Sequence, residues 1–411
     1  MRVTYDILIV GSGVIGCATA LAIAQQTSLK VGVVDSKINK YEWNENNSYE
    51  PRVSAISHAS KNILSHLGAW DDIEKKRVSA YTKMKAWDSE GTGSIFFDSS
   101  QVNENNLGYI IENNVISSSL LDKFSYYSNI SYFRPVKLTQ LEEFDDKIVL
   151  TCEDNTLIDA KLVIAADGFD SWVRKASNIE IKTHDYQHTA LVATVNTSLS
   201  HQNTARQRFL PSGPLAFLPL KNNFLSSIVW SASHDYARDL MMLSDDDFKD
   251  ELAKQFDYAL GDIIDVSKRF SFPLRMRHAK NYVKNRIALV GDALHTIHPL
   301  VGQGVNLGLL DAASLAEVII DAYTKNRDFS SISTLRRYER WRKTDTLAML
   351  SMVDLLKRLF ENKNAGVAYA RNVGLNFTNQ IPWIKHFIAH YALGKRGDLP
   401  LMANKQEELC F

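Results

Sequence analysis

Hydrophobic residues follow a distinct pattern in the first 35 residues of the chain. Residues 7–10 (Ile-Leu-Ile-Val) and 31–34 (Val-Gly-Val-Val) are short aliphatic runs, typical of strands that are buried on both faces. Residues 17–26 between them are rich in Ala and Leu and predict a helix. This order predicts a βαβ unit with two parallel strands.

The turn between the first strand and the helix reads Gly-Ser-Gly-Val-Ile-Gly. Gly11 permits a tight turn, Gly13 lets a pyrophosphate approach the backbone, and Gly16 lets the helix pack closely on the strand. Asp35 ends the second strand, where a carboxylate accepts hydrogen bonds from ribose hydroxyls. The unit predicts a bound dinucleotide and, by itself, leaves NAD and FAD open.

Two later aliphatic runs also end in acidic residues. Residues 162–168 lead into Asp-Gly, and residues 286–293 lead into Gly-Asp. The second run is followed by Gly-Gln-Gly-Val-Asn at 302–306 and by a predicted helix over 307–322. Elsewhere, short alternating strands at 81–99 and 183–271 predict an antiparallel sheet, and residues 345–392 are predicted to be helical.

Composition and charge exclude several classes of protein. Lys and Arg total 47, as do Asp and Glu, so a dedicated nucleic-acid binder is disfavoured. Cys17, Cys152 and Cys410 are far apart and predict neither a disulfide framework nor a zinc site, and no other metal site is expected. No signal peptide and no apolar run of about 18 residues are recognised, so we expect a cytoplasmic protein, with peripheral contact to the inner membrane as an open alternative.

Taken together, the glycine turn, the Asp-Gly segment and the Gly-Asp segment resemble the three signatures of class A flavoprotein monooxygenases. The resemblance is narrower in two further segments, residues 52–57 (Arg-Val-Ser-Ala-Ile-Ser) and 291–308. Both resemble the UbiH/UbiF/VisC family, the FAD-dependent hydroxylases of ubiquinone biosynthesis. The similarity extends to about residue 341. Leu310 departs from the family pattern, in which Arg is common before the acid at Asp311, and this puts a local salt bridge in doubt.

The resemblance implies FAD as the bound cofactor, with NAD(P)H as a transient reductant. It implies that Asp292 binds the ribityl hydroxyls and that the helix after residue 304 directs its N-terminus at the flavin. The implied cofactor-binding residues are Gly11, Gly13, Val14, Ile15, Gly16, Asp35, Arg52, Val136, Asp167, Gly168, Gly291, Asp292, Pro299, Gly302, Gly304, Val305 and Asn306.

Several side chains keep two interpretations each. Arg52 balances charge beside the flavin or is a solvated surface residue, and Asn306 supports the turn or touches the ring. Arg174 holds the nicotinamide cofactor or caps the strand–helix junction. His298 and Pro299 are expected near the flavin, with no catalytic residue assigned.

The implied fold is α/β: a Rossmann-like FAD-binding domain, an inserted mixed or antiparallel β-sheet substrate domain, and a helical C-terminal tail. We expect the FAD-binding domain at 1–80, 100–182 and 272–344, the substrate-binding sheet at 81–99 and 183–271, and the C-terminal region at 345–411. Aromatic residues of the inserted sheet are expected as pocket walls or, alternatively, as core: Phe209, Phe217 and Trp230.

The implied activity is hydroxylation of the aromatic ring of a polyprenylphenol with NAD(P)H and O₂, through a flavin C4a-hydroperoxide. A hydroxylase of a small soluble aromatic compound and a non-catalytic flavin-binding scaffold are the alternatives. A complex of ubiquinone-biosynthesis proteins and a homo-oligomer are open as assemblies. The amphipathic segment 381–396 suits a membrane surface or a partner protein, and core packing is its alternative.

Overall fold

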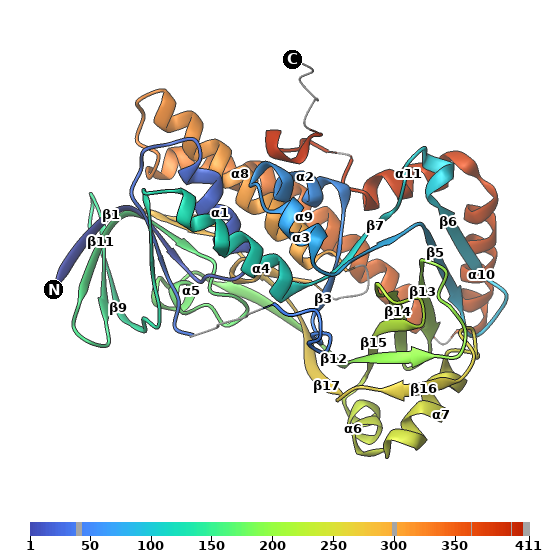
Figure 1. Ribbon diagram of the computed structural model, residues 1–411. Helices are drawn as coiled ribbons and strands as arrows, with labels where there is room; N and C mark the ends of the chain where they lie inside the picture. Colours follow the sequence, from blue (N-terminus) through green and yellow to red (C-terminus); the bar gives the residue numbers. More distant parts are fainter. Residues whose placement is uncertain (38–42, 298–301, 363, 396, 406–411) are drawn as a thin grey trace.

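The computed structural model describes residues 1–37, 43–297, 302–362, 364–395 and 397–405. It has the predicted α/β class, with helices packed on a parallel sheet at one end and a second, larger sheet at the other (Figure 1). Three sheets are formed within the described residues.

The first sheet has the strand order β18-β19-β11-β1-β2-β8. Neighbouring strands from β19 to β8 are parallel, as expected for buried aliphatic strands, and β18, β9 and β10 add antiparallel pairs. The bounds are β1 Arg2–Val10, β2 Val31–Val34, β8 Ile130–Phe133, β9 Leu138–Glu143, β10 Ile148–Cys152, β11 Leu157–Ala165, β18 Val283–Lys284 and β19 Ile287–Leu289.

Helices α1 and α8 pack together against this sheet (Figure 1). Helix α1 begins three residues earlier than predicted, because the helix starts within the glycine turn itself. The bounds of the helices of this half are α1 Val14–Ala24, α2 His58–His66, α3 Trp70–Lys75, α4 Asn113–Asp122, α5 Trp172–Ala176 and α8 Gly304–Thr324, with 3₁₀ turns η2 Lys123–Tyr126, η3 Gly291–Ala293 and η5 Leu401–Ala403.

A small sheet of order β3-β7-β4 lies between the two large sheets. Its strands are β3 Val53–Ile56, β4 Val78–Tyr81 and β7 Gly108–Glu112. The third sheet has the order β20-β17-β12-β15-β14-β13-β5-β6, with β16 paired to β12. Its bounds are β5 Lys83–Asp88, β6 Ser94–Asp98, β12 Ile181–Thr197, β13 Thr204–Leu210, β14 Gly213–Pro219, β15 Leu225–Ser233, β16 Ile263–Val266, β17 Phe270–Ala279 and β20 His295–Thr296, with the 3₁₀ turn η1 Ser99–Val102.

Helices α6 (His234–Met242) and α7 (Asp245–Gln255) cover one face of this third sheet (Figure 1). Phe217 and Trp230 point toward these helices and are fully buried among them. Both residues are therefore core rather than pocket walls, because side chains alternate between the two faces of a strand and theirs lie on the helix-covered face.

The C-terminal region is helical, as predicted. Helix α9 (Ile332–Glu361) continues across residue 344, and α10 (Ala365–Gln380) and α11 (Pro382–Ala392) follow it. Helix α10 lies along the edge strand β6 (Figure 1). Three of its asparagines accept hydrogen bonds from backbone N–H groups of this edge: Asn372 from Gly93, Asn376 from Ser94 and Asn379 from Phe96.

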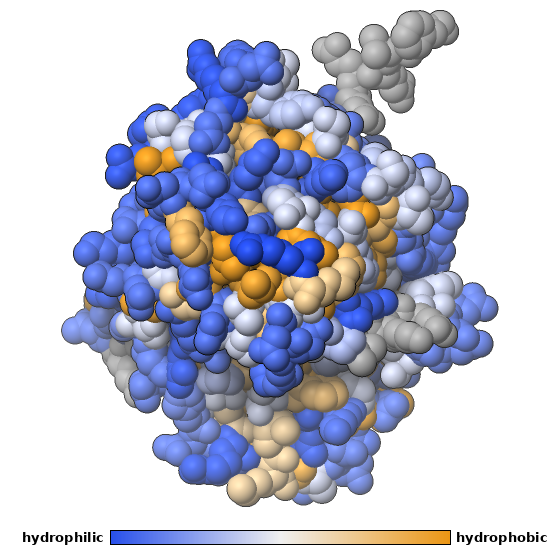
Figure 2. Space-filling view, turned by 90° about the vertical axis from the view of Figure 1, so that its left-hand side faces the viewer, coloured by the Kyte–Doolittle hydropathy of each residue, from blue (hydrophilic) through white to orange (hydrophobic). Residues whose placement is uncertain are grey.

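A buried ion pair anchors the same helix. Arg371 Nε lies 2.6 Å from Asp88 Oδ2, and both side chains are buried. No helix within the described residues is long and apolar enough to cross a membrane. The face seen in Figure 2 is mostly hydrophilic, with apolar residues gathered near its middle.

Candidate functional site

The candidate cofactor site lies at the carboxyl edge of the parallel sheet. Gly11 N–H donates to Val34 O at 2.8 Å, Ala166 N–H to Val10 O at 2.8 Å, and Val290 N–H to Ala165 O at 3.0 Å. These bonds join the ends of β1, β2, β11 and β19. Open α/β sheets bind ligands in the crevice outside such strand ends.

The glycine turn leaves space for a ligand at one position only. A Cβ on Gly11 would lie 2.4 Å from Ala166 O, and a Cβ on Gly16 would lie 1.9 Å from Gly11 O. Gly13, in contrast, has open space around it, and α1 begins there without a side-chain cap. This combination of a tight turn, an open backbone position and uncapped helix amides fits a pyrophosphate.

Asp35 has a role within the turn. Its carboxylate accepts hydrogen bonds from Ser12 N–H at 2.7 Å and from Ser12 Oγ at 2.8 Å. Its backbone carbonyl accepts the Val136 N–H at 2.8 Å. Asp35 therefore ties the glycine turn to the end of β2, and Val136 is brought beside it.

Asp292 follows β19 at the carboxyl edge of the sheet, where its side chain is available to bind a ligand. Its carboxylate has no hydrogen-bond partner among the described residues, while burial raises its pKa and the charges of Arg52 and His295 act against that rise. The Arg52 guanidinium is exposed and lies 5.5 Å from the Phe272 ring centroid. An unpaired carboxylate beside a cation fits the ribityl hydroxyls of FAD.

The Asp-Gly segment holds a second unpaired oxygen. Asp167 Oδ2 accepts the N–H groups of Trp172 and Val173, whereas Oδ1 is buried without a partner among the described residues. Burial raises the pKa of Asp167. Gly168 has a φ of 81° and open space around it, so the chain turns sharply beside this acid.

Arg174 has a structural role. Its side chain is 2% exposed, and its guanidinium donates to Ala293 O at 2.8 Å and to Phe169 O at 3.1 Å. This geometry favours the interpretation of Arg174 as a residue of the strand–helix junction, because its buried guanidinium binds two backbone carbonyls.

The start of α8 is fixed by an asparagine clamp. Asn306 Oδ1 accepts Ser57 N–H at 3.0 Å, and its Nδ2 donates to Ala55 O at 2.8 Å. Asn306 therefore supports the helix start by binding β3 as a neighbouring strand would. Gly302, Gly304 and Val305 lie at this helix start, whereas Pro299 and His298 lie outside the described residues.

Sequence reasoning missed a buried charge network beneath the Gly-Asp turn. Asp311 accepts hydrogen bonds from His295 Nε2 at 2.6 Å, from Arg342 Nε at 3.1 Å and from Gly291 N–H at 3.3 Å. Burial opposes ionisation of Asp311, but His295 and Arg342 outweigh it and hold its pKa below the usual value. The acid in an otherwise apolar helix was a signal, but its partner Arg342 lies 31 residues away.

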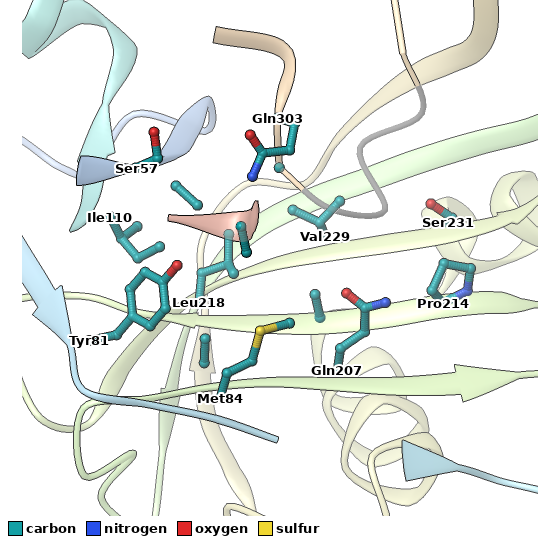
Figure 3. A pocket seen from close by; sticks show the side chains of 15 residues that line it. Ser57, Tyr81, Met84, Ile110, Gln207, Pro214, Leu218, Val229, Ser231 and Gln303 are labelled. Carbon is teal, nitrogen blue, oxygen red and sulfur yellow. The ribbon is translucent and has the colours of Figure 1, made fainter. Parts of the chain in front are cut away.

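A mostly apolar pocket opens beside the start of α8 (Figure 3). Gly302 and Gln303 line one side, and the third sheet lines the other through small residues such as Ala205, Ala216 and Val229. Tyr81 of β4 and Ala392 of α11 also reach it. Helix α11 thus contributes to the pocket wall, which the sequence pattern of the tail did not indicate.

Comparison with known proteins identifies the family. The model of the FAD binding domain family matches residues 4–350. Human ubiquinone biosynthesis monooxygenase COQ6, mitochondrial, is 34% identical over 94% of this chain and 92% of its own length. The 3-demethoxyubiquinol 3-hydroxylase of Escherichia coli is 35% identical over 95% of this chain and 98% of its own. The chain belongs to this family of FAD-dependent monooxygenases.

Further comparisons agree with this family. Ubiquinone hydroxylase UbiL of Rhodospirillum rubrum is 35% identical over 95% of this chain and 89% of its own. Among solved structures, p-nitrophenol 4-monooxygenase PnpA of Pseudomonas putida superimposes with a TM-score of 0.78 at 19% identity, covering 97% of this chain and all of that one. The family uses FAD, so the free acids and glycine turn described above belong to a flavoprotein.

Proposed function

We propose that this monooxygenase hydroxylates the aromatic ring of a polyprenylphenol intermediate of ubiquinone biosynthesis, using NAD(P)H and O₂. The observation that carries the proposal is the position of the apolar pocket, which adjoins Gly302 and Gln303 at the start of α8. An aromatic ring in this pocket would lie against the segment that the family resemblance assigns to the flavin.

We also propose which residues hold FAD. The pyrophosphate would lie at Gly13 and the uncapped start of α1, the ribose at Asp35, and the ribityl chain at Asp292. The remaining proposed contacts are Gly11, Val14, Ile15, Gly16, Arg52, Val136, Asp167, Gly168, Gly291, Pro299, Gly302, Gly304, Val305 and Asn306. When bound, FAD would supply the oxygen chemistry: two electrons from NAD(P)H allow O₂ to be split, so that one oxygen atom enters the ring and the other leaves as water.

The chain's own contribution is position and exclusion of water. The start of α8 directs its free amides toward the flavin, and the Asn306 clamp holds that start against β3. The small apolar side chains of the third sheet keep water away from the ring. We propose the third sheet as the substrate-binding part and the parallel sheet as the FAD-binding part. The third sheet extends beyond the boundaries expected from the sequence, because β17 runs to Ala279 and β20 joins it.

Anaerobic stopped-flow reduction of the FAD-loaded protein by NADPH tests the proposal. The measurement is made with and without a short-chain prenylphenol, and O₂ is then admitted for product analysis by mass spectrometry. Substrate-accelerated flavin bleaching and a product heavier by one oxygen are expected. Bound flavin that responds to no prenylphenol, with no oxygenated product, would contradict the proposal.

For the partners, we propose that the C-terminal helices contact the membrane in which a polyprenyl tail is dissolved. Tyr369 and Phe377 of α10 are 74% and 61% exposed, and Trp383 of α11 is 72% exposed. Exposed aromatic residues are typical of membrane-surface and partner-binding helices. Co-sedimentation with liposomes should fall when Phe377 and Trp383 are replaced by Ser; unchanged sedimentation would favour a protein partner.

A further inference from the structure

Three polar side chains in the pocket have no hydrogen-bond partner among the described residues. They are the Tyr81 hydroxyl of β4, the Gln207 amide of β13 and the Ser231 hydroxyl of β15. Gln207 is only 8% exposed and Ser231 only 2%. Their polar atoms are accessible from the cavity and not sealed in the protein, and a few unpaired polar groups converging on an apolar pocket are typical of a site that orients a ligand with matching polar atoms.

The surrounding residues leave room for Gln207. Gln207 is the direct cross-strand partner of Ala216, and Ala216 is the partner of Val229, so the three side chains form one row on the pocket face. Ala205 lies on the same face two residues before Gln207. The amide therefore extends over small neighbours into the cavity, as Figure 3 shows.

Tyr81 is held in a similar way from the opposite sheet. Its cross-strand partner is Gly108, and a Cβ on Gly108 would lie 2.9 Å from the Tyr81 hydroxyl oxygen. The absence of a side chain at Gly108 thus allows the ring to lie where its hydroxyl points into the cavity (Figure 3). Burial alone raises the pKa of Tyr81 to about 12, so the hydroxyl stays protonated and can donate.

We infer that Tyr81 on one side of the pocket, and Gln207 and Ser231 on the other, are positioning residues that bind two separate oxygen substituents of an aromatic ring, and thereby determine which ring carbon faces the flavin. This inference rests on the proposed function. The ligand class is a prenylated phenol that carries a second hydroxyl or methoxyl group. All three side chains can donate hydrogen bonds to a ring oxygen, while Met84, Leu218 and Val229 provide apolar lining for the ring and tail.

Equilibrium binding to the oxidised, FAD-loaded protein, followed by the change in flavin absorbance without NADPH, tests the inference. The probes are 2-geranyl-6-methoxyphenol and 2-geranylphenol, which lacks the second oxygen. The variants are Tyr81→Phe and Gln207→Leu, with Gln207→Met if the first Gln207 variant loses FAD. The controls Tyr126→Phe and Gln140→Leu make the same changes at exposed positions.

One of the two pocket variants should weaken binding of the methoxyphenol about five- to tenfold and leave binding of 2-geranylphenol unchanged, because one hydrogen bond is lost. The other should weaken both probes by a similar factor. In turnover, both variants should release more H₂O₂ per NADPH or shift the hydroxylated carbon. Equal binding of both probes by both variants and the wild type would overturn the inference.

The two proposals fail in different ways. If the wild-type protein binds the phenols with the expected dependence on Tyr81 and Gln207 but forms no oxygenated product, the proposed function fails and the binding inference stands. If the wild-type protein hydroxylates the probe and the variants bind it unchanged, the binding inference alone fails.

Discussion

The parallel sheet and the nine-stranded sheet of the described residues contribute different groups, because the first carries the candidate cofactor site at its strand ends and the second lines the apolar pocket. The parallel sheet contributes backbone amides and acids at strand ends, such as Asp167 and Asp292, which come from short contiguous motifs. The nine-stranded sheet contributes single side chains from β13, β14 and β15, spread over one face. Under the proposed function, cofactor binding would depend on local backbone shape, whereas substrate selection would depend on long-range strand pairing.

The largest effect is expected for the glycine turn. Gly16→Ala places a methyl group 1.9 Å from the Gly11 carbonyl oxygen. We therefore expect the free energy of unfolding to fall by more than ~3 kcal/mol and little FAD-loaded protein to form. Gly13→Ala has open space and should keep the unfolding temperature of the FAD-free protein while weakening FAD binding at least about tenfold. Thermal unfolding and flavin titration check both variants. If Gly16→Ala bound FAD and had normal stability, the close packing of Gly16 against Gly11 would be contradicted.

The buried network should give the next effect. Asp311→Asn removes the buried carboxylate that faces His295 and Arg342 and leaves Arg342 only the partly exposed Asp345, whose Oδ2 lies 3.2 Å from Nη1, so the free energy of unfolding should fall by about 3 kcal/mol. Adding Arg342→Met should restore part of the loss, since the double variant contains neither charge. Denaturant unfolding of the wild type, Asp311→Asn, Arg342→Met and the double variant checks this. Additive losses would show that the two residues act independently.

The junction of the two halves should respond to pH. His278 of β17 lies opposite His295 of β20 in the strand register. Burial, together with the nearby charges of His295, Lys343 and Lys182, lowers the pKa of His278 from 6.5 to about 4. The unfolded chain therefore binds the proton first, so stability is complete above pH 6.5 and falls by about 3 kcal/mol at most toward pH 4.

The variant His278→Asn should have a shallower loss of stability over this range, measured as unfolding temperature against pH. Parallel curves for the variant and the wild type would show that other groups cause the acid sensitivity.

The smallest effect is expected at Asp292. Asp292→Ala removes an acid with no protein partner among the described residues, so the fold should persist while FAD affinity falls about 10–100-fold. Asp146→Ala, at an exposed turn, is the matched control. Flavin titration compares them, and tight FAD binding by Asp292→Ala would contradict the ribityl assignment.

The same contrast explains what could be predicted from sequence. The βαβ unit and the helical tail were predicted correctly because their signals lie within a few residues of each other, as in Gly11–Gly16. The face of β14 and β15 that lines the pocket could not be chosen, since alternation separates Phe217 from Ala216 without saying which side the helices cover. Arg342 was missed because its partner lies on another helix.

The three asparagines of α10 have a consequence for how the chain can be shortened. Asn372, Asn376 and Asn379 occupy the backbone donors of Gly93, Ser94 and Phe96, which would otherwise form an open template for another strand. A chain ending before residue 365 would present that template to every neighbouring molecule. A C-terminal truncation should therefore cause self-association through β6 before it causes loss of flavin.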